Sequence, residues 1–202
     1  MKWAEEELAY TDLGDRRLNR RLMTTVTNLA AHPTASVPEA SGSWAATKAT
    51  YRLWDSDAPE VTPQAFLYSH QERTVERIRA LGQTTVLAVQ DTTDISIGDV
   101  EGAGYLDRPR QNGLKLHSVL VVSENGVPLG LLEQHAWARP SSSKGKAKTR
   151  RKRTTAQKES QRWLDGFAVA QAALPGNVTT VVTVADREAD IYDLFASPTQ
   201  NY

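Results

Sequence analysis

Apolar side chains in the first 80 or so residues recur at helical spacing. After Asp15, which suits a helix N-cap, apolar residues return at Leu18, Leu22, Val26 and Leu29, in steps of four, four and three. This spacing predicts an amphipathic helix with a polar, arginine-rich opposite face.

Further helices are expected before the pattern changes. The prolines up to Pro38 are expected to close the first helix and begin a loop, and a second helix is expected over residues 43–54. Thr62, followed by proline at the first helical position, predicts a third helix that runs to about Leu81. We therefore expect a helical domain over residues 1–82.

The second part of the chain has the pattern of buried strands. One Val-rich run leads into Asp91 and another into Asp186, and an Asn-Gly turn at 125–126 predicts a hairpin between them. An amphipathic helix is expected over residues 159–174, before the last strand. This order, with the last strand parallel to the first, is that of an RNase H-like core. The prediction is an α/β chain whose residues 83–202 form a partial mixed sheet with helices.

Charge changes this picture. The chain has 24 basic and 24 acidic residues, but one basic run contains no acid. Its members are Lys144, Lys146, Lys148, Arg150, Arg151, Lys152 and Arg153. Segregated positive charge favours a polyanionic partner, although a solvated loop without a fixed partner is the alternative.

Composition excludes several classes of protein. There is no cysteine, which rules out disulfides, thiolate zinc sites and a cysteine nucleophile. The N-terminus is acidic, and no apolar stretch approaches the length of a membrane span. We expect a cytoplasmic protein that has no membrane partner.

The strand-end acids are the candidate chemistry. A carboxylate at the carboxyl end of a buried strand stands where α/β sheets bind ligands. Asp91 and Asp186 on two such strands suggest one shared hard cation and metal-dependent phosphoryl chemistry. A single strand-end Asp is otherwise a cap or turn residue, and Asp94 and Asp190 are rival acids.

Two neighbours of these acids remain open. His117 lies mid-strand among apolar residues, where a hydrogen-bonded core histidine and a site residue are both reasonable. Arg187 follows Asp186 and could pair with a carboxylate or contact phosphate.

The N-terminal helices carry a second candidate site. The expected DNA-contacting residues are Arg17, Arg20, Arg21, Lys48 and Arg52, which helical spacing gathers on two helices. An ordinary solvated helix face is the alternative. Trp54 is expected to pack in the helical core.

Short motifs in one order resemble a known family. They are Asp91-Thr92-Thr93, Leu116-His117-Ser118-Val119-Leu120, Trp137-Ala138-Arg139-Pro140, Lys158-Glu159-Ser160 with Trp163, and Asp186-Arg187-Glu188-Ala189-Asp190. Upstream, Leu13-Gly14-Asp15-Arg16-Arg17 and Thr50-Tyr51-Arg52 extend the match. Together they resemble the bacterial insertion-sequence DDE transposases, in the branch of the cut-and-paste transposon called Tn-five.

The resemblance implies specific roles. Asp91 and Asp186 would be the first two catalytic, metal-binding acids of the DDE triad, with Mg²⁺ as the cofactor and Mn²⁺ as a substitute. Mg²⁺ prefers oxygen ligands and keeps several waters, so few carboxylates are needed. The partners would be double-stranded DNA, as transposon inverted-repeat ends and as target, and a second copy of the chain. The location would be the bacterial nucleoid.

One departure from the family limits the activity. The third acid of the family is a Glu in a Tyr-x-x-Arg-x-x-x-Glu pattern, and no Glu here fits it, since Glu159 and Glu188 belong to other motifs. We therefore expect a truncated transposase with little or no cleavage, missing dimer contacts and exposed apolar surface. The alternatives are a catalytically inactive DNA-binding remnant or regulator of transposition, and an unrelated α/β domain with a basic loop.

Overall fold

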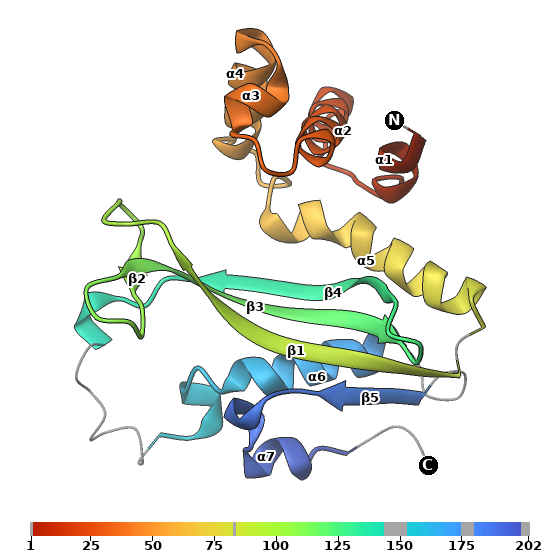
Figure 1. Cartoon of the computed structure of the whole chain (residues 1–202), viewed down its shortest axis with the longest axis vertical. Coiled ribbons are helices and arrows are strands. Elements are labelled where there is room, and N and C mark those ends of the chain that lie inside the picture. The colour runs from red at the N-terminus through yellow and green to blue at the C-terminus, as the bar shows by residue number, and fades with distance from the viewer. Residues whose placement is uncertain (1, 83, 144–152, 175–179, 199–202) are drawn as a thin grey trace. The chain divides into compact units, whose positions relative to one another are not determined.

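The chain divides into two compact units. The structure is a computed structural model that describes residues 2–82, 84–143, 153–174 and 180–198 (Figure 1). Contacts group residues Met1–Arg73 in one unit and Thr74–Tyr202 in the other. The division falls inside α5, somewhat before the expected domain limit, and the functional domain limits stay a prediction.

The first unit is helical, as the apolar spacing predicts. Its elements are α1 (Lys2–Glu7), α2 (Arg16–Ala31), α3 (Val37–Ser41), α4 (Trp44–Trp54) and the first part of α5 (Pro63–Ala80). The Asp15 side chain caps α2 by accepting from the Arg17 N–H at 2.7 Å. Thr62 caps α5 in the same way, through the Ala65 N–H at 3.1 Å. Both cap predictions are confirmed.

Four leucines form the core of this unit. Leu8, Leu13, Leu22 and Leu53 are buried together, with Leu18 and Val26 among the residues packed against them. Between α2 and α4 the buried hydroxyls of Thr25 and Thr50 form a hydrogen bond of 3.0 Å. This pairing satisfies two polar groups that would otherwise cost free energy in the helix–helix interface.

Two helices lie where none was expected. The loop predicted at the prolines is wrong in part, because Pro38 stands in the first turn of α3, where its missing N–H costs no hydrogen bond. Gly42 ends α3 with a φ of +67°, which glycine adopts readily. The short helix α1 has too few residues to show a period in the sequence.

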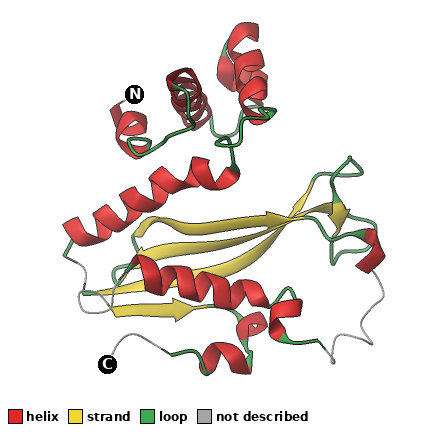
Figure 2. Ribbon diagram, turned by 180° about the vertical axis from the view of Figure 1, so that it is seen from behind, coloured by secondary structure: helices red, strands yellow, loops and turns green. Residues whose placement is uncertain are grey.

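The second unit is built on one mixed sheet. Its strands are β1 (Thr85–Ser96), β2 (Gly104–Tyr105), β3 (Asn112–Ser123), β4 (Pro128–Trp137) and β5 (Thr180–Val184). The order is β2-β3-β1-β5, and β4 pairs with the other part of β3 (Figure 2). β1 is antiparallel to β3 and parallel to β5, so the predicted strand order and directions are confirmed.

The hairpin between β3 and β4 also agrees with its sequence signal. Gly126 has a φ of +80° and donates its N–H to the Ser123 carbonyl at 2.9 Å. Because this conformation suits glycine, the Asn-Gly pair fixes where the chain reverses.

The first strand is longer than expected. Instead of ending at Asp91, β1 continues in register with β3 as far as the pair Ser96 and Gly113. A Cβ on Gly113 would lie 1.9 Å from the Ile95 carbonyl oxygen, so only glycine permits this approach. The stretch between β1 and β3 contains the short strand β2.

Helix α6 (Gln161–Ala173) covers one face of the sheet, as the view from behind shows (Figure 2). The buried core of the unit lies here, with Val86, Ala88, Val119 and Ala170 among its members. A Cβ on Gly166 would lie 2.5 Å from Gln90 Oε1, so this glycine lets the helix approach the strands closely.

The remaining elements are short. They are the 3₁₀ turns η1 (Ser141–Ser143), η3 (Thr155–Gln157) and η4 (Arg187–Ala189), and the final helix α7 (Tyr192–Phe195). Among the described residues, the helices are all too short or too polar to span a membrane.

Candidate functional site

Asp91 lies on the sheet face opposite α6. Along β1 the buried residues alternate, ending with Ala88 and Gln90 under α6. The intervening side chains belong to the other face, where Val89 is half-buried and Asp91 is exposed. The prediction that Asp91 ends its strand is wrong, because β1 keeps pairing with β3. Asp91 instead lies just beyond the point where β1 stops pairing with β5.

Asp186 follows the neighbouring strand β5, two residues after its last residue, Val184. β5 pairs with β1 in parallel as far as Val184 opposite Val89. Extending this register by two residues on each strand would set Asp186 opposite Asp91. Adjacent strands lie about 4.8 Å apart, which is within the reach of two carboxylates that share a cation.

Asp186 also has a local structural role. Its Oδ1 accepts the Glu188 N–H at 2.8 Å and so caps η4. The cap and the metal ligand proposed from the sequence are compatible, because a carboxylate has two oxygens and several lone pairs.

The two acids suit a hard cation. Exposed carboxylates are the oxygen donors that Mg²⁺ prefers, and waters can complete its octahedron. Among the residues that the structure describes, no cluster of three or more His, Cys, Asp or Glu side chains could hold a metal ion. Asp91 and Asp186 alone would leave most positions of a Mg²⁺ octahedron to water.

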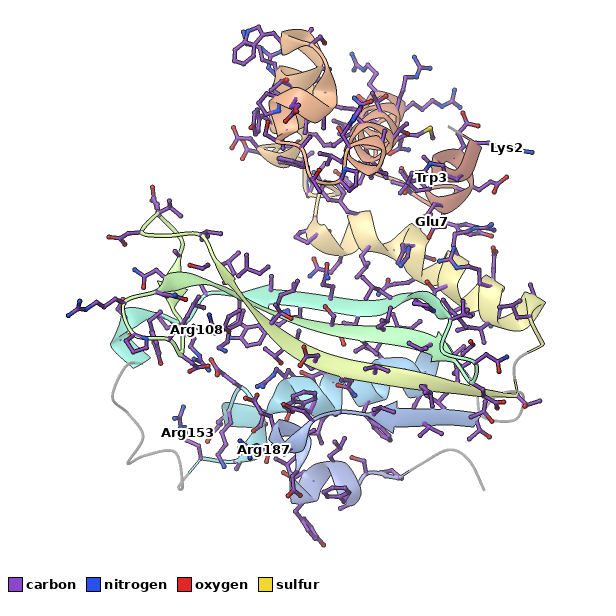
Figure 3. All side chains as sticks on the ribbon, viewed as in Figure 1. Lys2, Trp3, Glu7, Arg108, Arg153 and Arg187 are labelled. Atoms are coloured by element: carbon purple, nitrogen blue, oxygen red, sulfur yellow. The ribbon has the colours of Figure 1, made fainter. Side chains whose placement is uncertain are left out.

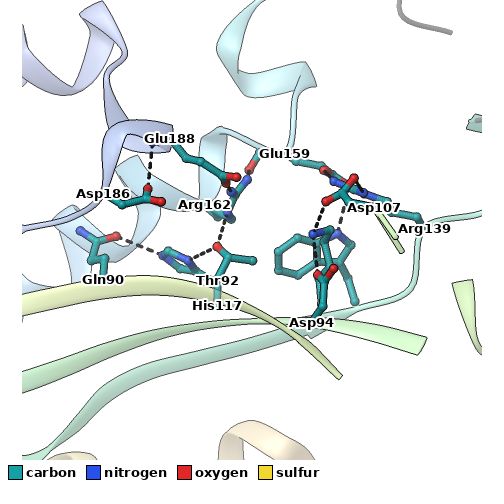
Figure 4. A network of polar contacts seen from close by, with 12 residues as sticks. Gln90, Thr92, Asp94, Asp107, His117, Arg139, Glu159, Arg162, Asp186 and Glu188 are labelled. Carbon is teal, nitrogen blue, oxygen red and sulfur yellow. Dashed lines mark hydrogen bonds and ion pairs between the residues drawn. The ribbon is translucent and has the colours of Figure 1, made fainter. Parts of the chain in front are cut away.

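A polar network lies under α6, around the β1 residues that neighbour Asp91 in sequence and His117 of β3, and Figure 4 shows it with Asp186. His117 Nδ1 is 2.9 Å from Thr92 Oγ1, and the Gln90 amide lies 3.1 Å from His117 Nε2. When the Gln90 amide nitrogen faces the ring, it donates to Nε2 and also to the Trp163 carbonyl at 3.3 Å. In that arrangement His117 is neutral and donates from Nδ1 to Thr92.

His117 is a buried core histidine, one of the two outcomes left open. Its side chain is 1% exposed and contacts the Trp163 ring edge to face, with the centroids 4.7 Å apart. Burial lowers its pKa to about 4, and the Arg162 cation acts in the same direction, while Asp91 opposes them. It therefore stays neutral near pH 7.

Arg162 extends this network to the loop that carries Asp186. Its Nε donates to Thr92 Oγ1 at 2.7 Å, and its Nη2 pairs with Glu188 Oε2 at 2.7 Å. The sequence identified the motif around Trp163 but not this arginine, because the contact joins residues 70 positions apart.

A second charge cluster contains Asp94, one of the two acids that could have been a site residue in place of Asp91 or Asp186. Asp94 accepts from Lys115 Nζ at 2.6 Å, and Lys115 also pairs with Asp107 at 2.7 Å. Arg139 joins Asp107 to Glu159 through contacts of 2.5 Å. Although burial raises the pKa of Asp107, the hydrogen bonds from Lys115 and Arg139 hold it below its ordinary value. Asp94 is therefore engaged in holding the sheet together.

Beside Asp186 the structure has a cavity of about 510 Å³. Asp186, Arg187 and Asp190 line it together with Phe167 and Phe195. Arg187 is exposed, as is Arg153 (Figure 3). Asp186, Arg187 and the two aromatic side chains therefore line the same recess. Asp190 contributes a second carboxylate to it.

The basic residues predicted to contact DNA lie on α2 and α4. Arg17, Arg20, Lys48 and Arg52 are exposed, and Arg21 is half-buried. The hydrogen bond between Thr25 and Thr50 holds these two helices together. Arg17 pairs with Asp15 at 3.1 Å, and the hydrogen bond to this carboxylate raises the pKa of Arg17 above its ordinary value.

Aromatic side chains extend this surface. Trp44 is 69% exposed and lies 5.2 Å from the Lys48 ammonium, and Tyr51 contacts Trp54 edge to face. The expectation that Trp54 packs in the core is wrong, because it is 46% exposed and Leu53 fills that position instead. This one-residue difference leaves the Trp54 ring exposed on α4, in contact with Tyr51.

Most of the basic run lies outside the described residues. Lys144, Lys146, Lys148, Arg150, Arg151 and Lys152 fall there, and only the exposed Arg153 is described. Its proposed role in DNA binding stays a prediction.

A helical unit with an exposed basic and aromatic face is typical of a DNA-binding module. Residues 1–58 match the family model described as transposase DNA-binding. The match ends just after α4 and includes the whole basic face. It supports a transposase N-terminal DNA-binding domain and DNA as its partner.

Proposed function

We propose that this protein is a transposase of the DDE class, in the Tn-five branch, which binds inverted-repeat transposon ends through its first unit. The family match over residues 1–58 carries the proposal. The strand order of the second unit, which is the one expected of an RNase H-like core, supports the cleavage and strand-transfer function, as do Asp91 on β1 and Asp186 two residues after the parallel strand β5. Its expected place of action is the bacterial nucleoid.

The first unit would bind the DNA backbone. Exposed Arg20, Lys48 and Arg52 can each neutralise a phosphate, while the adjoining rings of Trp44 and Tyr51 offer apolar contacts to base edges or sugars. Phosphate contacts fix orientation on the duplex, and sequence choice would come from the remaining contacts.

In the second unit Asp91 and Asp186 would hold Mg²⁺, or Mn²⁺ in its place. When bound, such ions activate a water or a 3′-hydroxyl and neutralise charge on the leaving oxygen. The two aspartates supply the oxygen ligands and the fixed negative charge. The buried network keeps His117 neutral, so no histidine cation competes with the metal beside them.

A second candidate is a catalytically inactive DNA-binding protein that regulates transposition. One observation favours it: within the described part of the chain, Asp91 and Asp186 have no third carboxylate or histidine to complete a three-ligand group. This candidate predicts DNA binding without metal binding.

DNA binding by the first unit can be tested through its salt dependence. We expect fluorescence anisotropy with a duplex to show affinity that falls steeply as salt rises. The double substitution Arg20→Gln and Arg52→Gln should reduce the slope of log K against log salt by about 2, at about 0.9 for each lost phosphate contact. The exposed Arg79→Gln, on the second unit, is a control that should leave the slope unchanged. Salt-independent binding, or none, would refute the DNA-binding assignment.

Metal binding by the second unit separates the two candidates. We expect Mn²⁺ to broaden the amide resonances of the residues around Asp91 and Asp186, in a titration of the whole chain. Asp91→Asn and Asp186→Asn should each raise the Mn²⁺ dissociation constant by more than about tenfold, since each removes a charged ligand. DNA binding with no aspartate-dependent broadening would favour the inactive regulator.

A further inference from the structure

One side chain contacts both segments that carry the acids. Arg162, in α6, donates to Thr92, which follows Asp91 in β1. The same guanidinium pairs with Glu188, which lies two residues after Asp186 (Figure 4). It is therefore a bridge between two segments far apart in sequence.

Such a bridge is needed because the sheet does not hold Asp186. The β1–β5 pairing stops at Val184, so the ladder leaves the next residues without strand partners. Asp186 is oriented instead by η4, whose Glu188 N–H it accepts. The position of Asp186 relative to β1 thus depends on what holds Glu188.

Arg162 is itself firmly placed. Its side chain is 12% exposed, and its Nη1 donates to the Glu159 carbonyl at 2.8 Å. The guanidinium also lies 5.0 Å from the ring centroid of Trp163 and 5.8 Å from that of Trp137. A planar fork with several donors in fixed directions can bind three acceptors at once, which a lysine ammonium on a flexible stem does less well.

We propose that Arg162 is a positioning residue of the two-acid site, which fixes the loop carrying Asp186 against the strand carrying Asp91 through Glu188 and Thr92. This inference rests on the proposed function. Arg162 does not bind the metal. It sets the separation of the two carboxylates that do, so its loss weakens the site without removing a ligand.

The buried position argues against a direct phosphate contact. The donors Nε, Nη1 and Nη2 already have protein acceptors within 2.8 Å. Binding a phosphate would require breaking at least one of them. The exposed Arg187 on the same loop is the better placed of the two for that purpose.

The test is the conservative variant Arg162→Lys, which keeps the charge. We expect its Mn²⁺ dissociation constant to rise on the order of tenfold, as is usual when a residue that orients the ligands of a metal from outside is changed. Without metal, the Glu188 amide should exchange its hydrogen on the order of tenfold faster, because the loop opens more often. The matched control is the exposed Arg79→Lys, in a helix away from the acids, which should change neither value, and duplex affinity should stay unchanged in both variants.

A double-mutant cycle tests whether Arg162 acts through Glu188. Glu188→Gln should weaken Mn²⁺ binding as Arg162→Lys does. The double variant should bind Mn²⁺ no more weakly than whichever single variant binds it more weakly. Glu188→Gln also reports the same contact should Arg162→Lys fail to fold.

The outcomes distinguish this inference from the proposed function. If Mn²⁺ binding depends on both aspartates but not on Arg162 or Glu188, the positioning role is refuted and the metal site stands. If Arg162→Lys lowers duplex affinity alone, the residue contacts phosphate and the inference is wrong. If wild-type broadening does not depend on the aspartates, the metal site fails, and the positioning role with it.

Discussion

Acidification from pH 6.5 to pH 4 is expected to destabilise the second unit by about 3 kcal/mol through His117 alone. Each pKa unit between the folded and unfolded states corresponds to about 1.4 kcal/mol. Burial lowers the pKa of His117 from 6.5 to about 4 in the folded protein. Between pH 6.5 and pH 4 the unfolded chain therefore binds a proton at His117 that the folded chain does not bind. The free energy of unfolding consequently falls as the pH falls.

Urea unfolding at several pH values, followed by tryptophan fluorescence, measures this effect. The reference is His117→Gln, which keeps a neutral hydrogen-bonding side chain and removes the titration. Groups other than His117 are the same in both proteins, so their contributions cancel in the difference. Equal pH dependence of the two proteins between pH 4 and 6.5 would show that His117 accepts a proton freely in the folded state.

Local sequence signals predicted the elements that local chemistry builds. The caps at Asp15 and Thr62 and the turn at Gly126 depend on residues within a few positions, and the structure confirms all three. The length of β1 depends instead on a distant glycine, Gly113, that permits close pairing. No pattern inside β1 contains that information.

The same distinction applies to the site. Asp91 and Asp186 could be proposed from the sequence because each follows a Val-rich run, and the β1–β5 register runs to Val89 and Val184, two residues before each acid. Thr92 and Arg162 could not, because their contact spans 70 positions and joins a strand to a helix. Lys115 was missed for a related reason: a lysine with so little exposure is tolerated only because two aspartates meet it in space.

The open face of the sheet connects stability with function. Val182 and Val184, on β5, are 42% and 40% exposed, on strand positions that lead to Asp186. Exposed apolar surface was expected from the sequence, and it lies next to the acids, not away from them. The buried face under α6 therefore supplies most of the stability of the sheet. The largest side chain buried there is that of Trp163.

Trp163→Ala is expected to destabilise the second unit by about 3–5 kcal/mol, the usual cost of emptying a fully buried aromatic site. Trp163 is 1% exposed and contacts both His117 and Arg162. Trp163→Phe is expected to cost about 1 kcal/mol or less, because the indole N–H is buried without a hydrogen-bond partner in the described structure. Phenylalanine keeps a ring against His117 and removes that unpaired donor, which offsets part of the lost volume.

Urea unfolding at pH 7 compares the two variants with the wild type, and far-ultraviolet circular dichroism shows that each one folds. The contrast between the variants is informative, since both remove the indole nitrogen and only one removes the ring. If Trp163→Phe is as damaging as Trp163→Ala, the indole nitrogen must have a partner, and a buried water or an unseen acceptor stabilises the network. A small cost for phenylalanine alone would instead show that ring packing, not hydrogen bonding, holds α6 against His117 and so keeps Arg162 in reach of Thr92 and Glu188.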